Sequence, residues 1–133
     1  MDAAANGRTL RAGHLEIRPA DRAALVDGRP LTLTVRELEL LTALAERAGR
    51  IVGREELHAV VWTGKYRSCD RSVDVYISKL RAKLEQALPG WRYIHTHFGF
   101  GYRFSPEPLG SPEPIAPRVA VDGSNGGRAE RGL

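Results

Sequence analysis

The side chains best suited to binding chemistry in this sequence are the cations of residues 70–84, DRSVDVYISKLRAKL. Guanidinium and ammonium groups donate strong hydrogen bonds to phosphate oxygens and to the edges of bases. A helical period of about 3.6 residues gathers the apolar residues of the segment within roughly 60° of one another, and these are Val73, Ile77, Leu80 and Leu84. The opposite side carries Arg71, Val75, Ser78, Lys79 and Ala82. We expect a helix whose outer face is either merely solvated or binds a polyanion.

Two other groups of residues could bind metal or act as nucleophiles. His95 and His97 lie two positions apart in an expected strand, so they face the same side. A zinc site needs at least three protein ligands, and the one thiol, Cys69, lies in a separate segment. Cys69 also lacks an adjoining glycine-rich oxyanion motif. We therefore expect no metal, no cofactor and no enzymatic activity; the histidines could instead gain a proton near phosphate at a pH of about 6.5.

The positive charge of the chain is concentrated in its C-terminal half. Residues 70–104 contain six basic and three acidic side chains, a net charge of +3, whereas residues 34–62 contain four and five, a net charge of −1. Local excess of this kind is the electrostatic footprint of nucleic-acid binding. The single cysteine excludes an internal disulfide. No run approaches the ~18 apolar residues of a membrane span, so we expect a cytoplasmic protein without membrane contact.

The remaining pattern predicts an α+β domain. Strands are expected at 14–18, at 23–26, around Leu31 and Leu33, and at 93–96 and 102–104 on either side of a glycine-rich turn. A capping box of Thr34 and Glu37 begins a helix that ends at Gly49, with a buried stripe of Leu38, Leu41, Leu44, Ala45 and Ala48. A brief extended link, 51–52, precedes a helix over 54–62, whose apolar side is Leu57, Val60 and Val61. Asp70 caps the third helix and Pro89-Gly90 ends it.

Composition divides the chain into three parts. Residues 1–13 are small and polar and are expected to be a disordered lead or linker, residues 14–104 form the domain, and residues 105–133 form a disordered tail rich in proline and glycine. Residues 1–33 are too short for a phosphorylatable receiver domain. We expect the chain to be either the effector part of a longer regulator or a domain that acts alone.

Three blocks of the sequence, LTLTVRELELLTALAERAGRIVGREELHAVVW, DRSVDVYISKLRAKLE and YIHTHFGFGYRF, resemble the winged-helix effector domain of OmpR/PhoB-type response regulators, the output proteins of two-component phosphorelays. The resemblance implies a winged helix-turn-helix fold with a short N-terminal antiparallel sheet of four strands, a three-helix core and a C-terminal β-hairpin wing. It implies transcription regulation by sequence-specific binding to double-stranded DNA. Helix 70–88 would enter the major groove and wing 93–104 would lie over the adjacent minor groove.

The resemblance also implies roles for individual residues. Base contacts would come from Asp74, Val75 and Lys79, and DNA backbone contacts from Arg71, Ser72, Ser78, Arg81, Thr96 and Trp62, the last of these being equally a core residue. Loop 63–69 would touch RNA polymerase through Lys65, Tyr66 and Arg67. Relatives bind as head-to-tail pairs on tandem half-sites, so a weak monomer that dimerises on DNA is expected.

Two positions depart from the family pattern. Where relatives carry a wing arginine, this chain has Phe98 after His97, and Ser78 stands where arginine is common. We expect Phe98 to pack onto its own hairpin, the alternative being a wedge between bases. The alternative function is a protein-interaction module that uses loop 63–69 and has weak DNA affinity.

Overall fold

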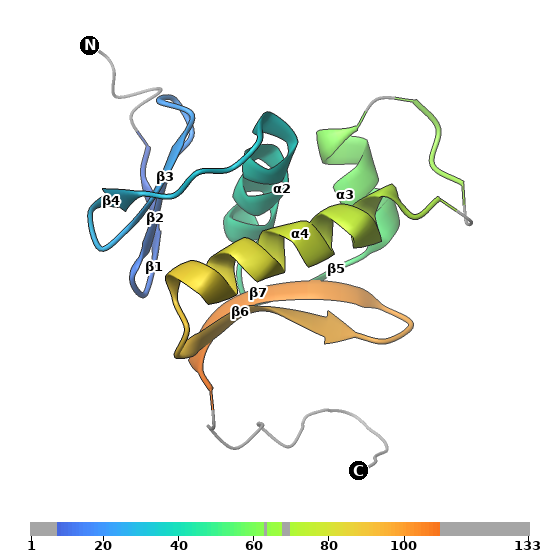
Figure 1. The fold of residues 1–133 in the computed structure, drawn as a ribbon. Coiled ribbons are helices and arrows are strands. Elements are labelled where there is room, and N and C mark those ends of the chain that lie inside the picture. Colours follow the sequence, from blue (N-terminus) through green and yellow to red (C-terminus); the bar gives the residue numbers. More distant parts are fainter. Residues whose placement is uncertain (1–7, 63, 68–69, 110–133) are drawn as a thin grey trace.

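Two small antiparallel sheets flank three helices in the computed structural model of this chain, which describes residues 8–62, 64–67 and 70–109 (Figure 1). The first sheet contains β1 (Leu10–Ala12), β2 (Leu15–Arg18), β3 (Ala23–Val26) and β4 (Arg29–Pro30) in that order. The helices are α2 (Val35–Glu46), α3 (Arg54–Val61) and α4 (Ser72–Ala87). The second sheet contains β5 (Ile51–Val52), β6 (Trp91–His97) and β7 (Gly101–Pro108) in the order β5-β7-β6. The predicted α+β fold, with three helices and a C-terminal hairpin, is confirmed.

The N-terminal sheet begins earlier than the sequence predicts. Strand β1 lies within the expected lead 1–13 and pairs with β2, Leu10 opposite Ile17. The Tyr93 hydroxyl donates to the carbonyl of Ala12 (3.0 Å) and accepts from the amide of His14 (3.1 Å), which ties this edge to the hairpin. The fourth strand is Arg29–Pro30, not the expected strand around residues 31 and 33. The predicted boundary at residue 14 is therefore too late, because pairing with β2 and the Tyr93 bond compensate for a weak local signal.

Helix α2 begins with the predicted capping box. The Thr34 hydroxyl accepts from the Glu37 amide at 3.2 Å, and the Glu37 carboxylate accepts from the Thr34 amide at 2.8 Å. The buried face is wider than the predicted stripe, because α2 contacts α3, α4, β1 and β7. Its buried residues are Glu37, Leu40, Leu41, Ala43 and Leu44, whereas Ala48 lies beyond the end of the helix and is exposed.

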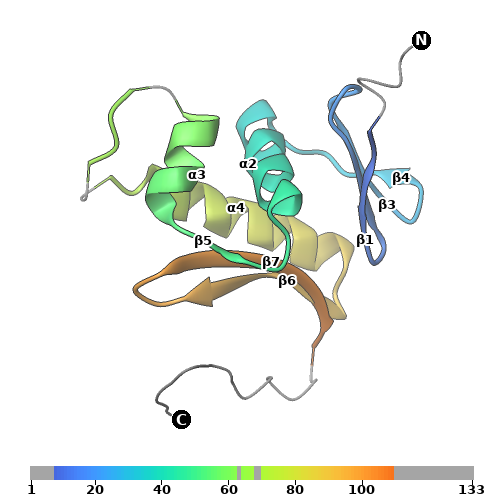
Figure 2. The ribbon, with the colours of Figure 1, turned by 180° about the vertical axis from the view of Figure 1, so that it is seen from behind.

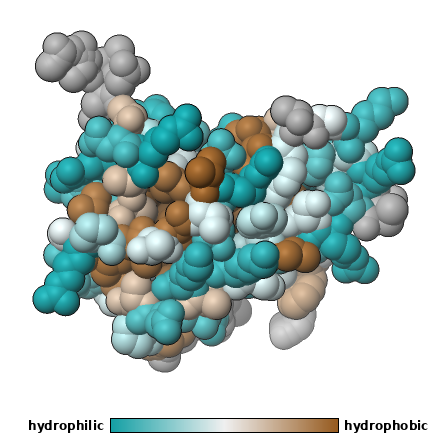
Figure 3. Space-filling view, turned by 45° about the horizontal axis from the view of Figure 1, so that its top comes forward, coloured by the Kyte–Doolittle hydropathy of each residue, from teal (hydrophilic) through white to brown (hydrophobic). Residues whose placement is uncertain are grey.

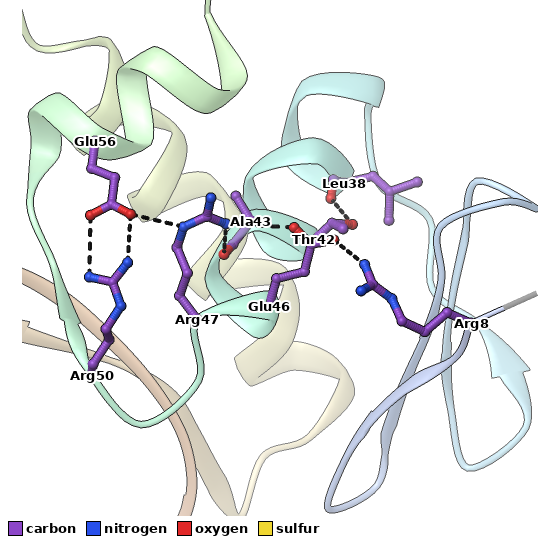
Figure 4. Close-up of polar contacts among 8 residues, drawn as sticks. All are labelled: Arg8, Leu38, Thr42, Ala43, Glu46, Arg47, Arg50 and Glu56. Atoms are coloured by element: carbon purple, nitrogen blue, oxygen red, sulfur yellow. Dashed lines mark hydrogen bonds and ion pairs between the residues drawn. The ribbon is translucent and has the colours of Figure 1, made fainter. Parts of the chain in front are cut away.

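A network of arginines and glutamates holds the α2–α3 junction (Figure 4). Glu56 at the start of α3 accepts from Arg47 (3.0 Å) and from Arg50 (2.6 Å). Hydrogen bonds from Arg50 and Arg47 lower the pKa of Glu56. On the other side of α2, Arg8 from the N-terminal segment pairs with Glu46. These pairs are exposed or partly exposed, so they orient the elements more than they stabilise them.

Helix α3 buries most of the predicted apolar side, since Leu57 is buried and Val61 packs against the core, but not Val60. Leu57 and His58 are its buried residues, while Val60 is 47% exposed. Val60 lines a groove of about 370 Å³ between the N-terminal sheet and α2, together with Leu33, Val35 and Leu38. Apolar side chains are visible on this face between hydrophilic neighbours (Figure 3).

Within the described residues, no helix has both the length and the apolar character that a membrane span requires.

An ion pair between a buried carboxylate and a partly exposed ammonium joins α2 to α4. Glu37 is 2% exposed, and its carboxylate lies 2.7 Å from the Lys83 ammonium. Burial raises the pKa of Glu37, but hydrogen bonds from Lys83 and from the Thr34 amide outweigh burial, so the pKa lies below its ordinary value. One carboxylate therefore caps α2 and at the same time fixes α4 against it.

Glu37→Ala should lower the free energy of unfolding by about 2–4 kcal/mol, because it removes both the cap and the ion pair. Glu37→Gln retains the cap and should cost only about 1–2 kcal/mol. The charge-dependent part of the stability is present above the ordinary pKa of 4.5 and is lost as the pH falls below it. Urea unfolding at pH 7 and pH 4 measures both effects, with exposed Glu39→Gln as the control; equal stability of all four proteins would contradict the prediction.

The second sheet fixes the hairpin against the helices. The predicted link 51–52 is strand β5, which pairs with β7. Gly101 has φ +140°, and a Cβ there would lie 2.1 Å from the Val52 carbonyl oxygen. Only glycine permits this approach, so Gly101 positions the base of the wing. Strand β7 continues to Pro108, so the predicted C-terminal boundary of the domain, at residue 104, is too early. The rest of the predicted tail, 110–133, lies outside the described residues.

Gly101→Ala should lower the free energy of unfolding by about 2–4 kcal/mol, because the chain must separate β5 from β7 or adopt a strained φ. Gly90→Ala is the matched control, since no atom lies within 4 Å of its added Cβ. Thermal unfolding of the two variants measures the difference. Similar melting temperatures would mean that the β5–β7 approach tolerates a side chain.

Candidate nucleic-acid interface

Helix α4 buries the predicted stripe and exposes the predicted face. Val73, Ile77 and Leu80 are fully buried and Leu84 is 3% exposed. Five residues are exposed on the outer side: Arg71, Val75, Ser78, Lys79 and Ala82. The Lys79 ammonium lies 5.0 Å from the centre of the Tyr76 ring, a cation–π contact that holds the cation beside the helix. The carboxylate of Asp70 accepts from the Ser72 amide (2.8 Å), which lowers the pKa of Asp70 and supports the start of the helix.

The Asp74 carboxylate is directed into the domain. It accepts from the Arg54 guanidinium at 2.7 Å and from the Tyr102 hydroxyl. Burial raises the pKa of Asp74, but these two hydrogen bonds and the charges of Arg54 and Arg71 outweigh burial, so the pKa lies below its usual range. Burial and the bond to Asp74 raise the pKa of Tyr102, so its hydroxyl stays protonated and donates. This contact joins α4 to α3 and to β7.

Arg81 continues the network from α4 to β6. Its guanidinium donates to the Thr96 hydroxyl at 2.8 Å and to the Ile94 carbonyl at 3.3 Å. It also lies 5.8 Å from the centre of the Tyr102 ring, and the Arg54 guanidinium lies 5.7 Å from the same centre. The structure thus brings together Arg81 and Thr96, two residues predicted to contact the DNA backbone.

A polar groove of about 390 Å³ separates the C-terminal half of α4 from the hairpin. Eight residues line it, and three of them are arginines while one is a glutamate: Arg81, Arg92, Arg103, Glu85, Ile94, His95, Thr96 and His97. The Arg103 guanidinium donates to His97 (3.1 Å) and lies 3.3 Å from the Glu107 carboxylate. The balance of charge in the groove favours an anion such as a phosphate group.

The two histidines share this groove, as the strand alternation predicts. The Nε2 atom of His95 lies 2.8 Å from the Ser105 carbonyl oxygen. A carbonyl only accepts, so this nitrogen carries its proton and cannot ligate a metal through Nε2. Across the described ranges, no group of three or more His, Cys, Asp or Glu side chains is arranged to hold a metal ion.

Trp62 belongs to an aromatic cluster at the end of α3. Its ring stacks on His58 at 5.7 Å and meets the edge of Tyr76 at 5.6 Å, and the Arg36 guanidinium lies 5.1 Å from its centre. His58 is 4% exposed, and its Nε2 lies 3.4 Å from Asp70. Trp62 is therefore a packing residue that is partly exposed, which is compatible with both predicted roles.

The loop after α3 shows only part of the predicted surface. Lys65 and Arg67 are exposed, as expected, but Tyr66 is half-buried, with its ring 5.3 Å from that of His58. Tyr66, which the resemblance implies as a polymerase contact, is thus only partly accessible, because the aromatic cluster retains its ring. Cys69 and residues 63 and 68 lie outside the described residues.

The wing tip contradicts the expected packing of Phe98. Phe98 is 89% exposed and Phe100 is 73% exposed. The turn spans only residues 98–100, and the Phe100 amide donates to the His97 carbonyl at 2.9 Å. A turn this short directs its side chains outward, so neither ring folds back onto the hairpin.

Sequence reasoning missed the residues that organise this surface, above all Arg54, His58 and Tyr102. They act through residues distant in the chain, and no local period marks them. A partial signal exists for Tyr102, an aromatic next to the glycine of the wing. The sequence around Arg54 indicates only a charged residue in the first turn of a helix and does not indicate its contact with Asp74.

Asp74→Asn should lower the free energy of unfolding by about 1–3 kcal/mol near pH 7, because Arg54 loses its ionised partner. A lowered carboxyl pKa adds stability that is present above the ordinary value of 3.8 and is lost as the pH falls below it. The gap between the wild type and Asp74→Asn should therefore narrow below pH ~4. Urea unfolding across this range measures the gap, with exposed Asp21→Asn as the control; a gap independent of pH would contradict the role of the charge.

An N-terminal sheet, three helices and a C-terminal wing define the winged helix-turn-helix class, and solved members of this class superpose on the chain. The DNA-binding domain of CpxR from E. coli matches with a TM-score of 0.68 and 35% identity, covering 74% of this chain and 96% of that domain. The Klebsiella pneumoniae RstA DNA-binding domain, solved in complex with the RstA box, also matches with a TM-score of 0.68 and 35% identity, covering 75% of this chain and 99% of that domain.

The chain belongs to the family described as "Transcriptional regulatory protein, C terminal", whose model matches residues 28–104. The transcriptional regulatory protein CreB of Escherichia coli is 40% identical over 94 residues, covering 70% of this chain and 41% of CreB. PrrA of Mycobacterium tuberculosis is 38% identical over 100 residues, covering 75% of this chain and 42% of PrrA. The chain thus spans about two fifths of the length of these relatives, and its predicted resemblance to OmpR/PhoB-type regulators is confirmed. The family is one of transcription regulators, not a class of enzymes.

Proposed function

We propose that this domain binds double-stranded DNA in a sequence-specific manner and regulates transcription. The observation that carries the proposal is the exposed face of α4, which is basic and otherwise small, beside a groove lined by three arginines. A helix of this kind fits the major groove, and the adjacent hairpin then lies over the minor groove. The relative RstA, solved in complex with the RstA box, supports the same use of the fold.

The proposed roles separate base reading from positioning. Val75, 46% exposed, meets a thymine methyl, and Lys79 donates to a base edge. Five residues contact the DNA backbone: Arg71, Ser72, Ser78, Arg81 and Thr96. Asp74 was predicted to contact bases, but its carboxylate is already engaged by Arg54 and Tyr102. We therefore assign Asp74 to positioning α4, with Trp62 packing beneath its first turn.

Assembly and partners follow from the same proposal. Two copies bind head to tail on tandem half-sites about one helical turn apart, each copy being a weak monomer in solution. The exposed cations Lys65 and Arg67 offer a contact to RNA polymerase. A regulator that acts on DNA in this way works in the cytoplasm.

Lys79→Ala should weaken binding to a selected site by about 1–3 kcal/mol and relax one base preference, whereas Arg71→Ala should weaken selected and random DNA alike. The probes are a random pool of 30-bp duplexes and the duplexes enriched from it. Arg8→Ala is the control, because Arg8 pairs with Glu46 on the far side of α2. Fluorescence anisotropy at two salt concentrations provides the affinities.

Affinity of the wild type for these duplexes should fall steeply with salt, since phosphate contacts release counterions. Equal losses on selected and random DNA for Lys79→Ala would contradict its base-reading role. No binding even at low salt would overturn the proposal and leave the domain as a protein-interaction module.

A further inference from the structure

The tip of the wing carries the two most exposed large apolar side chains among the described residues. Phe98 is 89% exposed and Phe100 is 73% exposed, ahead of Val35 at 62%. Both rings stand within one three-residue turn, 98–100. Exposed aromatic rings this close together mark a surface that acts by contact with a partner.

The turn holds both rings in a defined place. The Phe100 amide closes it on the His97 carbonyl (2.9 Å), and Gly99 has φ +83°, as the third position of a type II turn requires. His97 and Gly101 form the last pair of the hairpin, and Gly101 lies against the Val52 backbone. The rings are therefore presented by a base that is anchored to β5, and little order has to be gained when they bind.

The position of the tip ties it to the proposed DNA surface. Figures 1 and 2, which view the molecule from opposite sides, both show the hairpin turn at the end of the molecule where α4 begins. The arginine-lined groove between α4 and β6 includes His97, the residue that directly precedes Phe98. If the DNA backbone follows this protein groove, the minor groove of the duplex lies against the tip of the wing.

The charge of the wing tip determines which minor-groove sequences it favours. An arginine tip is attracted by the strong negative potential of a narrow A-tract. Residues 98–100 are Phe-Gly-Phe, and the neighbouring Arg103 is engaged by His97 and Glu107. The tip therefore offers apolar surface in place of charge, and apolar surface gains most from bases that are partly unstacked.

We propose that Phe98 and Phe100 form an aromatic wedge that enters the minor groove and partly unstacks a base step. The inference rests on the proposed function, because it assumes that α4 engages the same duplex. Unstacking is easiest at pyrimidine–purine steps such as TA and CA, and it bends the duplex toward the major groove. The wing thus selects a deformable step, and a rigid A-tract beneath it is disfavoured.

The test uses the full chain and a duplex enriched from a random 30-bp pool, with 2-aminopurine placed in turn at each position beneath the wing. Binding of the wild type should raise the fluorescence of one position by about two-fold or more, since unstacking relieves quenching. The double variant Phe98→Ala, Phe100→Ala should bind without this increase, whereas Phe98→Leu should retain it. Val35→Ala is the matched control, an exposed apolar residue outside the hairpin.

A second measurement exchanges the step beneath the wing for an A-tract. The wild type should lose about ten-fold in affinity, and the double alanine variant should be indifferent to the exchange. Phe98→Arg should reverse the preference and steepen the dependence on salt by about one phosphate contact. Circular dichroism confirms that each variant is folded, as expected for exposed positions.

The possible outcomes distinguish failure of the proposed DNA binding from failure of the proposed wedge. Wild type that binds no duplex contradicts the proposed function. Wild type that binds, with unchanged fluorescence at every position, overturns the wedge alone, as does an alanine variant that keeps the full increase. If the alanine variant loses affinity while 2-aminopurine never responds, the rings pack on sugars or on a protein partner, and the wedge is wrong.

Discussion

One carboxylate, that of Asp74, ties the exposed helix α4 to two neighbouring elements. It accepts from Arg54 in α3 and from Tyr102 in β7, so a single residue of the exposed helix is fixed to the element before it and to the wing after it. The cost of burying a charge is offset because the partners are a guanidinium and a protonated hydroxyl. Arg81 extends the connection to Thr96 on β6. The helix face and the groove beside it are therefore held to one another, and the affinity of that surface for a duplex does not require the domain to be reorganised.

A second ion pair, between the buried Glu37 and the partly exposed Lys83, acts at the other end of α4. Lys83 is engaged by Glu37, so one of the four cations in residues 70–84 is already paired within the domain. Counting the charged residues of a helix therefore overestimates the number of cations that a binding partner can contact. The outer face is correspondingly less charged than a count over the whole segment suggests.

Local patterns predicted the elements well and their contacts poorly. The α4 stripe and the capping box of Thr34 and Glu37 follow from helical period and end chemistry, and the structure has both. Strand β1 escaped notice because it is only three residues long, and β5, expected only as an extended link, is two residues long and pairs with β7 far along the chain. The Asp74 network joins residues 20 and 28 positions apart, which no periodicity reveals. Phe98 was expected to fold back because aromatic residues usually pack; the short turn excludes that geometry.

The pairing of β5 with β7 has a consequence for how the domain can vary. The wing is held from below by Ile51–Val52, which precedes α3, and from above by α4. The segment between α3 and α4 therefore connects two elements whose relative position is set elsewhere. Changes at Lys65 and Arg67, the exposed cations of that segment, leave the helix and the wing in register, whereas Tyr66 and Asp70 contact His58 of α3. A lineage could thus exchange these two exposed side chains without altering the face of α4 or the wing, and the two surfaces would evolve independently within a single small domain.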